Sequence, residues 1–381
     1  MENRIYLDNA ATTAIDPEVV ETMIPVLRDL YGNPSSTHGH GRKVKALLEE
    51  ARSKIARLLN CTPGEIIFTS GGTEADNMAI RGAVKHLGVK HIITSPIEHH
   101  AVVHTVEEMQ HSGKAEMHLV RLDEKGHVDL QHLEELLATY PDALVTLMHG
   151  NNEIGNLLDL EKVAALCVKY DAWFHTDSVQ TMGHYRFDLQ QLPVDFLACG
   201  AHKFNGPKGV GFIYIRKGSR IKPFITGGAQ EREMRGGTEN VYGIVGLAKA
   251  LEICYRDLDA KRAHVEGLKQ LMIDELRNAI PGIAFNGDAE GRCLYTVLSV
   301  SFPPSDAGDM LLFNLDLAGI SASGGSACSS GSNTGSHVIR ALDTDPLRTT
   351  VRFSFGKFNT ADEIIQVVGK LAEMYAVPAT H

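Results

Sequence analysis

Short apolar runs alternate with longer stretches of helical periodicity along most of the chain. The runs Glu65 to Thr69, His91 to Thr94 and Leu144 to Met148 have the length and composition of short buried strands. Helical stretches separate them through the first two thirds of the chain. Such alternation predicts an α/β fold, with a large domain in which helices cover both faces of a mostly parallel sheet.

The first predicted helix has a clear start. Asp16 suits the N-cap position and Pro17 the first helical position. Val20, Met23, Leu27 and Leu30 then follow at helical spacing and line one face up to Gly32. We therefore expect an amphipathic helix near the N-terminus.

The pattern changes after residue 255. A long helical region extends from Val241 to about Ala279, and it is followed by a strand (Thr296 to Phe302), a helix (Asp309 to Ala318), a second strand (Thr350 to Ser354) and a last helix. This order predicts a small mixed α/β domain at the C-terminal end. The large domain is expected to span residues 15–255.

A lysine and an aspartate follow two of the predicted strands. Lys203 lies just past the run Val194 to Cys199, in a turn rich in glycine, and Asp177 ends the run Asp171 to Asp177. Most lysines are solvated surface groups. Pyridoxal phosphate, however, needs a lysine amine for its aldehyde and an acid for its ring nitrogen. Lys203 and Asp177 fit that pair if their strands are neighbours.

A glycine turn offers a place for a phosphate. Ser70, Gly71 and Gly72 separate a predicted strand from a helix that starts at Thr73. Small residues let backbone N–H groups at a helix start approach an anion. The turn is not a Walker motif, because it lacks the lysine of that pattern, and an ordinary glycine turn is the alternative.

Composition limits the classes of partner. The 381 residues are 43% hydrophobic and carry a net charge of −10, which disfavours nucleic acid and anionic membranes. No apolar run approaches the roughly 18 residues of a membrane span, and no signal-peptide pattern is present, so a cytoplasmic location is expected. His100 and His104 have i,i+4 spacing without a third ligand, and we expect no intrinsic metal site.

One cysteine differs from the others by its surroundings. Cys328 lies in the loop Ser321 to Ser332, written SASGGSACSSGS, which has no large side chain and is expected to be mobile. A thiol on such a loop can reach a bound substrate. The cysteines of the remaining chain have no paired spacing and are interpreted as buried or incidental thiols: Cys61, Cys167, Cys199, Cys254 and Cys293.

Several motifs in order resemble one family along nearly the whole chain. They are YLDNAATT (Tyr6 to Thr13), GNPSSTH (Gly32 to His38), TSGGTEADN (Thr69 to Asn77), NNEIG (Asn151 to Gly155), HTDSVQ (His175 to Gln180), GAHKFNGPKGVG (Gly200 to Gly211), RGGTEN (Arg235 to Asn240), SGGSACSSGS (Ser323 to Ser332) and VRFSFGKF (Val351 to Phe358). The chain is similar to the cysteine desulfurases, pyridoxal phosphate enzymes of fold type I in the class-V aminotransferase group. By this resemblance residues 1–14 join residues 256–381 in the small domain, which carries the catalytic cysteine loop.

The resemblance implies a role for each matching residue. The catalytic residues would be Lys203, Cys328 and His99, whose ring stacks on the cofactor; Arg352 and Asn152 would bind the substrate. The residues implied to bind pyridoxal 5'-phosphate are Gly72, Thr73, His99, Asn152, Asp177, Gln180, Gly200, His202, Lys203 and Thr238. Members commonly have a serine where this chain has Gly200, so one hydrogen bond to the phosphate is expected to be missing or to be supplied by the backbone or by water.

The resemblance also implies partners. Thr238 matches a phosphate ligand that reaches across from a second subunit, which predicts a homodimer. L-cysteine would be converted to L-alanine, with a persulfide on Cys328 for a sulfur-acceptor protein such as an iron-sulfur scaffold. Cys328 could also transiently ligate an iron-sulfur cluster. A selenocysteine lyase, or a catalytically silent subunit with this fold, is the alternative.

Overall fold

A seven-stranded sheet forms the centre of the larger part of the molecule. The computed structural model describes residues 4–305, 308, 310–325 and 336–376. The strand order is β2-β8-β7-β6-β5-β3-β4, and neighbours are parallel except for β8, which is antiparallel to both β2 and β7. The strands are β2 (Ile66–Thr69), β3 (His91–Thr94), β4 (Glu116–Leu119), β5 (Ala143–Thr146), β6 (Trp173–Asp177), β7 (Phe196–Gly200) and β8 (Gly211–Ile215). The predicted α/β class with a mostly parallel sheet is confirmed.

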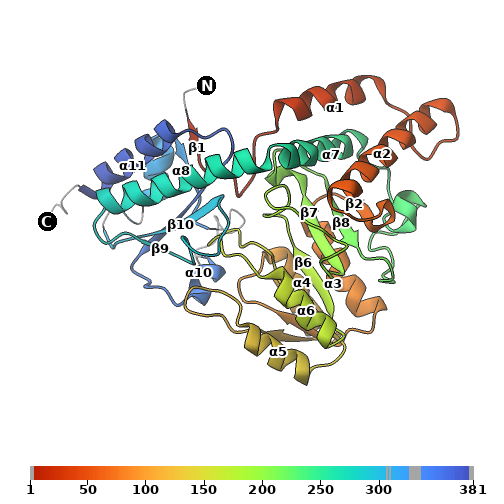
Figure 1. Cartoon of the computed structure of the whole chain (residues 1–381), viewed down its shortest axis with the longest axis horizontal. Helices are drawn as coiled ribbons and strands as arrows, with labels where there is room; N and C mark the ends of the chain where they lie inside the picture. Colours follow the sequence, from red (N-terminus) through yellow and green to blue (C-terminus); the bar gives the residue numbers. More distant parts are fainter. Residues whose placement is uncertain (1–3, 306–307, 309, 326–335, 377–381) are drawn as a thin grey trace.

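Helices surround this sheet and extend beyond it (Figure 1). They are α1 (Pro17–Asp29), α2 (Gly39–Leu58), α3 (Gly72–His86), α4 (His100–His111), α5 (Leu130–Thr139), α6 (Leu160–Lys169), α7 (Val241–Arg256), α8 (Leu258–Ala279), α9 (Leu311–Leu317), α10 (His337–Ala341) and α11 (Ala361–Ala376). No helix in the described ranges has both the length and the apolar character that crossing a bilayer requires.

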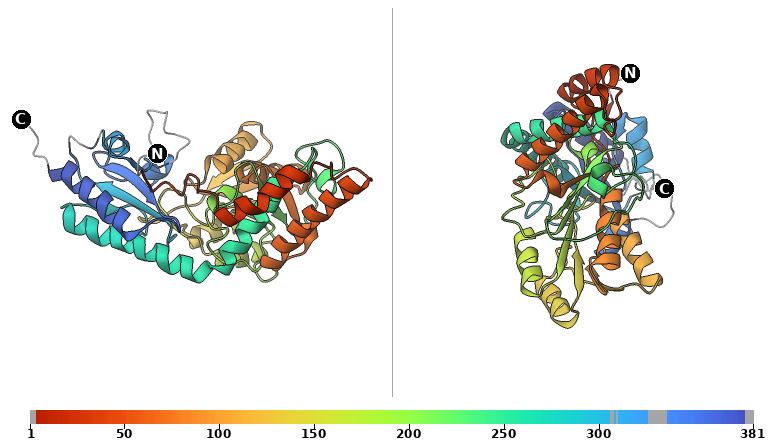
Figure 2. Two further views of the ribbon diagram at one scale, coloured as in Figure 1. Left: turned by 90° about the horizontal axis from the view of Figure 1, so that it is seen from above. Right: turned by 90° about the vertical axis from the view of Figure 1, so that its right-hand side faces the viewer.

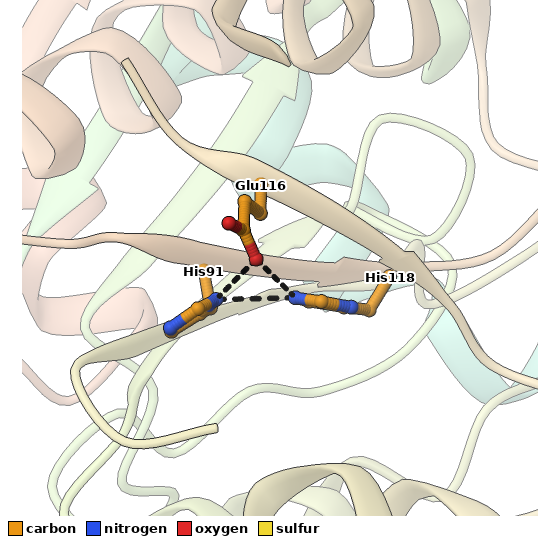
Figure 3. A group of neighbouring side chains, drawn as sticks. All are labelled: His91, Glu116 and His118. Atoms are coloured by element: carbon orange, nitrogen blue, oxygen red, sulfur yellow. Dashed lines mark hydrogen bonds and ion pairs between the residues drawn. The ribbon is translucent and has the colours of Figure 1, made fainter. Parts of the chain in front are cut away.

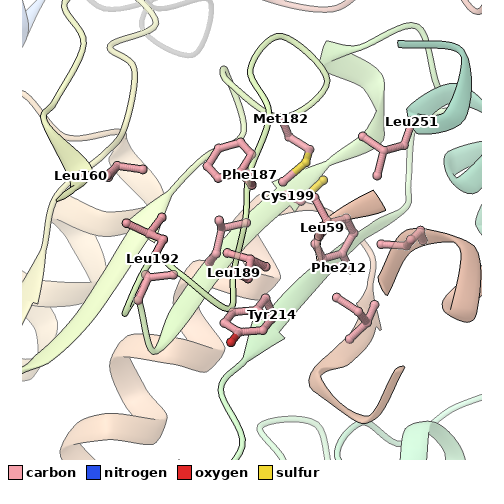
Figure 4. Packing of buried hydrophobic residues seen from close by; sticks show 14 of the residues in the cluster. Leu59, Leu160, Met182, Phe187, Leu189, Leu192, Cys199, Phe212, Tyr214 and Leu251 are labelled. Atoms are coloured by element: carbon pink, nitrogen blue, oxygen red, sulfur yellow. The ribbon is translucent and has the colours of Figure 1, made fainter. Parts of the chain in front are cut away.

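The central strands are apolar on both faces because helices cover both. Ile92 packs with α3 and α4 on one side, and its neighbour Ile93 packs in the cluster that includes α2, α6 and α7 on the other. Successive side chains of a strand point to opposite faces, so a strand buried on both must be apolar throughout. Figure 4 shows part of the second cluster, where Cys199, Phe212 and Tyr214 from β7 and β8 meet helix and loop residues.

A separate apolar cluster forms the smaller part of the molecule. It contains α8 and α11, the antiparallel sheet β12-β10-β9 and the parallel pair β1-β11. These strands are β1 (Ile5–Tyr6), β9 (Ala284–Phe285), β10 (Val297–Phe302), β11 (Ile320–Ser321) and β12 (Thr349–Ser354). Helix α8 follows α7 after Asp257 and runs along this part beside α11 (Figure 2).

The first residues of the chain belong to that smaller cluster. Ile5 and Leu7 are buried in it, and Ile5 pairs with Ile320 in the parallel β1-β11 ladder. The amide of Ala10 donates to Ser354 Oγ at 2.8 Å. These contacts support the proposed division of the chain, in which residues 1–14 and 256–381 form the small domain.

The first helix starts as predicted and Met23 packs against the core, but two of the positions assigned to its apolar face are exposed. Asp16 Oδ1 accepts from the Glu18 amide at 2.8 Å, as an N-cap does. Val19 and Val26 are buried, whereas Val20 is 39% exposed and Leu27 is 55% exposed. The helix is apolar on two sides, and its packing against α7, more than 200 positions later, decides which side faces inward.

Candidate active site

The candidate site forms where two parallel strands end side by side. β6 ends at Asp177 and β7 at Gly200, and these strands are neighbours, as the sequence predicts. A 3-10 turn, Ala201–Lys203, follows β7 directly. Because parallel strands present their carboxyl ends at one edge of a sheet, Asp177 and Lys203 come into one cavity.

That cavity has a volume of about 240 Å³. It brings together most of the residues to which the sequence assigns a role. Those that line it are Gly72, Thr73, His99, Asn152, Asp177, Gln180, His202, Lys203 and Arg352. They come from strand ends, a helix start and loops that are far apart in the chain.

Asp177 is a buried carboxyl group that lines this cavity. Its Oδ1 accepts from the amide of Val179 at 2.8 Å. Burial raises the pKa of Asp177 to about 6, while that hydrogen bond and the charge of Lys203 act in the opposite direction. A cationic group placed against Asp177 would therefore favour the ionised carboxylate.

Lys203 is held by the beginning of the chain. Its Nζ donates to the carbonyl oxygens of Ala10 and Ala11, at 2.5 and 2.9 Å. Gln180 Nε2 donates to the same Ala10 oxygen at 3.0 Å. The amine is thus anchored by backbone oxygens that a substrate or cofactor can replace.

The start of α3 forms one side of the cavity. Gly71 has φ +155°, a conformation that favours glycine, and α3 begins at Gly72. Gly72 and Thr73 line the cavity with the positive end of this helix. Gly200 does not line it, but a Cβ at Gly200 would lie 3.5 Å from the Gly72 amide nitrogen. This end of the cavity is suited to an anion.

Two histidines face the cavity as neutral rings. His99 is the N-cap of α4, and its Nδ1 accepts from the Ala101 amide at 3.2 Å. Burial, assisted by the charge of Lys203, lowers the pKa of His99 to about 4, and the same causes lower the pKa of His202 to about 4. His99 therefore offers a flat uncharged ring with its proton on Nε2.

Arg352 is almost fully buried on β12, with 1% of the residue exposed. Its Nη1 donates to the Asn152 carbonyl at 2.9 Å and its Nη2 to Asp8 Oδ1 at 2.7 Å. In the described part of the chain its Nε has no hydrogen-bond partner. A buried donor of this kind is suited to a carboxylate ligand.

Two predicted site residues are not placed in this cavity. One lines a different cavity, and the other lies outside the described residues. Thr238 is exposed and lines a different cavity together with Ser70 and Arg235, so the cavity around Lys203 does not include it. Cys328 lies within 326–335, outside the described residues, and its role stays a prediction from the sequence.

Asp76 is a residue of the cavity that the sequence did not single out. It lies on α3, and its Oδ1 is 3.3 Å from Nε2 of His175 on β6. Burial and the neighbouring charge of Asp177 raise the pKa of Asp76 well above its ordinary value. The sequence contains one signal for this residue. Asp76 follows Gly72 by four positions on the same helix, so the two residues share a helix face.

Comparison with known proteins shows to which family this chain belongs. The aminotransferase class-V family model matches residues 5–367. The chain belongs to the class-V aminotransferases. Curated relatives of this class-V aminotransferase include a putative cysteine desulfurase IscS 1 of Bacillus subtilis, 43% identical over 97% of this chain and 98% of the relative. A cysteine desulfurase IscS of Dictyoglomus turgidum is 42% identical over 96% of this chain and 92% of the relative.

Solved structures agree with this family. A NifS-like protein superposes with a TM-score of 0.90 at 38% identity, covering 98% of this chain and 99% of that chain. A structure described as SspA in complex with cysteine has a TM-score of 0.80 at 32% identity, covering 93% of this chain and 100% of that chain. The resemblance to the cysteine desulfurases is confirmed over nearly the full length.

The cofactor of this class-V aminotransferase is pyridoxal 5'-phosphate, and the cavity fits it. Lys203 supplies an amine for the aldehyde, and the carboxyl group of Asp177 suits the ring nitrogen. The start of α3 at Gly72 suits the phosphate, and the His99 ring is flat and neutral. Donors and acceptors of the types that the cofactor requires thus surround one space.

Proposed function

We propose that this class-V aminotransferase removes the sulfur atom of L-cysteine, releases L-alanine and stores the sulfur as a persulfide on Cys328. In this reaction the C–S bond of cysteine breaks and an S–S bond forms at Cys328. The electron pair of the C–S bond stays on the β-carbon, which takes a proton and is reduced, while the sulfur is oxidised to the level of a persulfide. No external oxidant or reductant is therefore needed. The observation that supports the proposal is that Lys203, Asp177 and the buried Arg352 line one cavity.

Each residue has a separate task in this proposal. Bound pyridoxal phosphate would supply the electron sink that weakens the bonds around the substrate carbon bearing the amino group. Asp177 would hold a proton on the ring nitrogen of the bound cofactor, and Lys203 would carry protons to and from the substrate. Arg352 binds the substrate carboxylate through its guanidinium donors, with Asn152 beside it.

His99 and Cys328 would complete the reaction. Because His99 Nδ1 accepts from the Ala101 amide, its ring can donate from Nε2 toward a bound ligand. The thiolate of Cys328 attacks the substrate sulfur, since a thiolate is the nucleophilic form of cysteine. The sulfur then passes to an acceptor protein, for which an iron-sulfur scaffold is our proposal, and we place the reaction in the cytoplasm.

The assignment of the lysine can be tested directly. In the full-length protein loaded with pyridoxal phosphate, borohydride should fix the cofactor to the peptide that contains Lys203, and added cysteine should yield alanine and sulfide. Lys203→Ala is expected to abolish both results. The matched control is Lys208→Ala, on an exposed lysine of the same glycine-rich loop, which should keep both. Cofactor fixed to Lys208 in the parent protein would overturn the assignment.

We also infer that the active form is a homodimer. Thr238 is exposed and lies outside the cavity around Lys203, which supports a role toward the site of a second subunit. Light scattering of the active protein is expected to give the mass of two chains or a multiple of it. A monomer mass at full activity would contradict this inference.

A further inference from the structure

A group of potential metal ligands lies near the amino-terminal ends of β3 and β4, at one side of the central sheet. His91 begins β3, while Glu116 and His118 lie on β4, the last strand in the sheet order. The carboxyl-terminal ends of the strands carry the cofactor cavity, and His91 and Glu116 are the first residues of their strands. The group is therefore separated from the cavity by the length of the strands.

The three side chains converge on one point, as Figure 3 shows. His91 Nδ1 lies 3.1 Å from His118 Nε2. Glu116 Oε2 lies 3.5 Å from His91 Nδ1 and 3.9 Å from His118 Nε2. These three atoms are each a lone-pair donor in the appropriate protonation state.

The strand register explains this convergence. His91 pairs with Glu116 across the parallel β3-β4 ladder. Glu116 and His118 are two positions apart on the same strand and so project from the same face of the sheet. The backbone of two hydrogen-bonded strands thus fixes the positions of all three side chains.

An aromatic side chain holds the two imidazole rings in place. Tyr140, the residue that follows α5, stacks on the His118 ring with centroids 3.7 Å apart and an angle of 17° between the planes. The Tyr140 and His91 ring centroids are 5.0 Å apart. Both histidines are partly buried, so their orientations are restricted before any ion binds.

The spacing of the ligand atoms matches a tetrahedral ion. Zinc bonds to histidine nitrogen or carboxylate oxygen of about 2.0–2.1 Å give a distance of about 3.3 Å between ligand atoms at a tetrahedral angle. The three observed distances, 3.1, 3.5 and 3.9 Å, bracket this value. Only small side-chain movements are needed, and the side chain of Glu116 has room for them because it is 73% exposed.

We propose that His91, Glu116 and His118 bind one Zn²⁺ ion, with water as the fourth ligand. Two histidines and one carboxylate form a ligand set that zinc uses in proteins. Binding requires the proton shared between the two rings to leave the His91 Nδ1 and His118 Nε2 positions. The proton can move to the other nitrogen of the ring that carries it, because each neutral imidazole has a second nitrogen that can hold a proton. Both nitrogens that face the ion then have a free lone pair.

A zinc ion at this site would stabilise the fold and would not take part in the reaction of the enzyme. It would connect the edge strand β4 to β3 near their amino-terminal ends, in addition to the ladder between them and the hydrogen bond from the Met117 amide to Gln110 Oε1 of α4. A second potential ligand group, Asp76, His99 and Asp177, belongs to the cofactor cavity and is not proposed as a metal site. Zinc at His91 is therefore expected to raise thermal stability and to leave the cysteine desulfurase rate unchanged.

The test uses the full-length protein with its cofactor, freed of metal by a chelator. Calorimetric titration with ZnCl₂ should show one site per chain that is weakened at least about tenfold by His118→Ala and by Glu116→Gln. The melting temperature should rise with zinc in the parent and not in these variants. Zinc bound by cysteine thiols would contribute equally to the titrations of the parent and of both variants.

The matched control is His104→Ala. His104 stacks on His100 with centroids 4.9 Å apart, on α4, so this variant removes a histidine from another histidine pair without changing the proposed ligands. Its zinc affinity should equal that of the parent. No saturable zinc site in the parent, or equal affinity in the parent and His118→Ala, would overturn the proposal. A loss of the site in His104→Ala alone would also overturn it.

Discussion

Arg352 Nη2 donates to Asp8 Oδ1 at 2.7 Å and so ties the last strand of the small domain to the segment that follows the first strand. The Asn152 carbonyl holds the other terminal nitrogen of the same guanidinium group. The arginine is thus fixed in position before substrate binds. Its Nε has no hydrogen-bond partner among the described residues, and because Arg352 lines the cavity, a ligand bound there could supply the acceptor.

This relationship predicts the effect of Arg352→Lys. A lysine ammonium cannot reproduce a planar fork that contacts Asp8, Asn152 and a substrate carboxylate together. We expect the KM for cysteine to rise at least about tenfold, with a smaller change in kcat, because the lost contact binds substrate in the ground state as well. Steady-state measurement of alanine formation gives both constants.

Arg348→Lys is the control for this variant. Arg348 lies next to the other end of β12 and donates from Nε to Ser301 Oγ at 2.8 Å, away from the cavity. Its KM should equal that of the parent. An unchanged KM in Arg352→Lys would show that the substrate carboxylate binds elsewhere.

Asp177→Asn is predicted to change the pH dependence of stability in the protein without cofactor. Burial raises the folded-state pKa of Asp177 to about 6, above the ordinary 3.8. A raised pKa stabilises the fold fully below the unfolded value and loses that contribution as the pH rises through the folded value. The parent should therefore lose stability relative to Asp177→Asn between about pH 4 and pH 6.

Thermal unfolding of both proteins at several pH values measures this difference. Asparagine keeps an oxygen that can accept from the Val179 amide, so the variant should fold. It should also lose desulfurase activity, because a neutral amide does not hold a proton on the cofactor ring. A difference in melting temperature that stays constant from pH 4 to pH 7 would contradict the assigned pKa.

Gly200→Ser is predicted to strengthen cofactor binding. A Cβ at Gly200 would have ordinary contacts with the Gly72 amide at 3.5 Å, the His202 ring at 3.6 Å and Val179 at 3.7 Å. The serine hydroxyl can therefore add one hydrogen bond near the phosphate end of the cavity. One such bond should lower the Kd for pyridoxal phosphate by roughly 2- to 10-fold.

Titration of the protein without cofactor, followed by absorbance, measures that Kd. Gly200→Ala is the matched control, because it adds the same Cβ without the hydroxyl and should leave the affinity unchanged. Equal gains in both variants would assign the effect to packing and not to a hydrogen bond.

Cys328→Ser is predicted to separate cofactor chemistry from sulfur transfer. Lys203, Asp177 and Arg352 line the cavity without any need for this thiol, so the variant should bind cofactor and substrate as before. Alanine formation should fall to near background, because a serine hydroxyl stays protonated near neutral pH and is a poor nucleophile toward sulfur.

Cys199→Ser is the control for that experiment. Cys199 is fully buried in β7, and burial raises the pKa of its thiol well above the ordinary value, so it is not available as a thiolate. This variant should keep most of its activity. A persulfide found on the Cys199 peptide after one turnover, or alanine production by Cys328→Ser at the parent rate, would contradict the assignment.

Local signals in the sequence were sufficient for much of the fold. The run His91 to Thr94 is the exact extent of β3, and Asp16 with Pro17 marked the start of α1. Each of these features depends on a few adjacent residues. β4 was missed, because Glu116 to Leu119 is short, partly polar and at the edge of the sheet, where the usual apolar signal is weak.

Features that depend on distant pairing could not be predicted in this way. Neither the exposed face of α1 nor the antiparallel direction of β8 follows from its own residues, since each is decided by its neighbours in space. The same limit applies to the site. Only its helical spacing from Gly72 marks Asp76, and the backbone oxygens that hold Lys203 have no local pattern that marks them as parts of the site.

The pairing of the chain's first residues with residues 320 and 354 has a consequence for biosynthesis. The oxygens of Ala10 and Ala11 that hold Lys203 are positioned by a segment that pairs with Ile320 and contacts Ser354. A ribosome makes the N-terminal segment first, at about 5–20 residues per second. The large sheet can form on a nascent chain, but the lysine anchor cannot be complete until Ser354 has emerged. The wall of the cavity that Ala10 and Ala11 form should therefore be complete only after Ser354 has been synthesised.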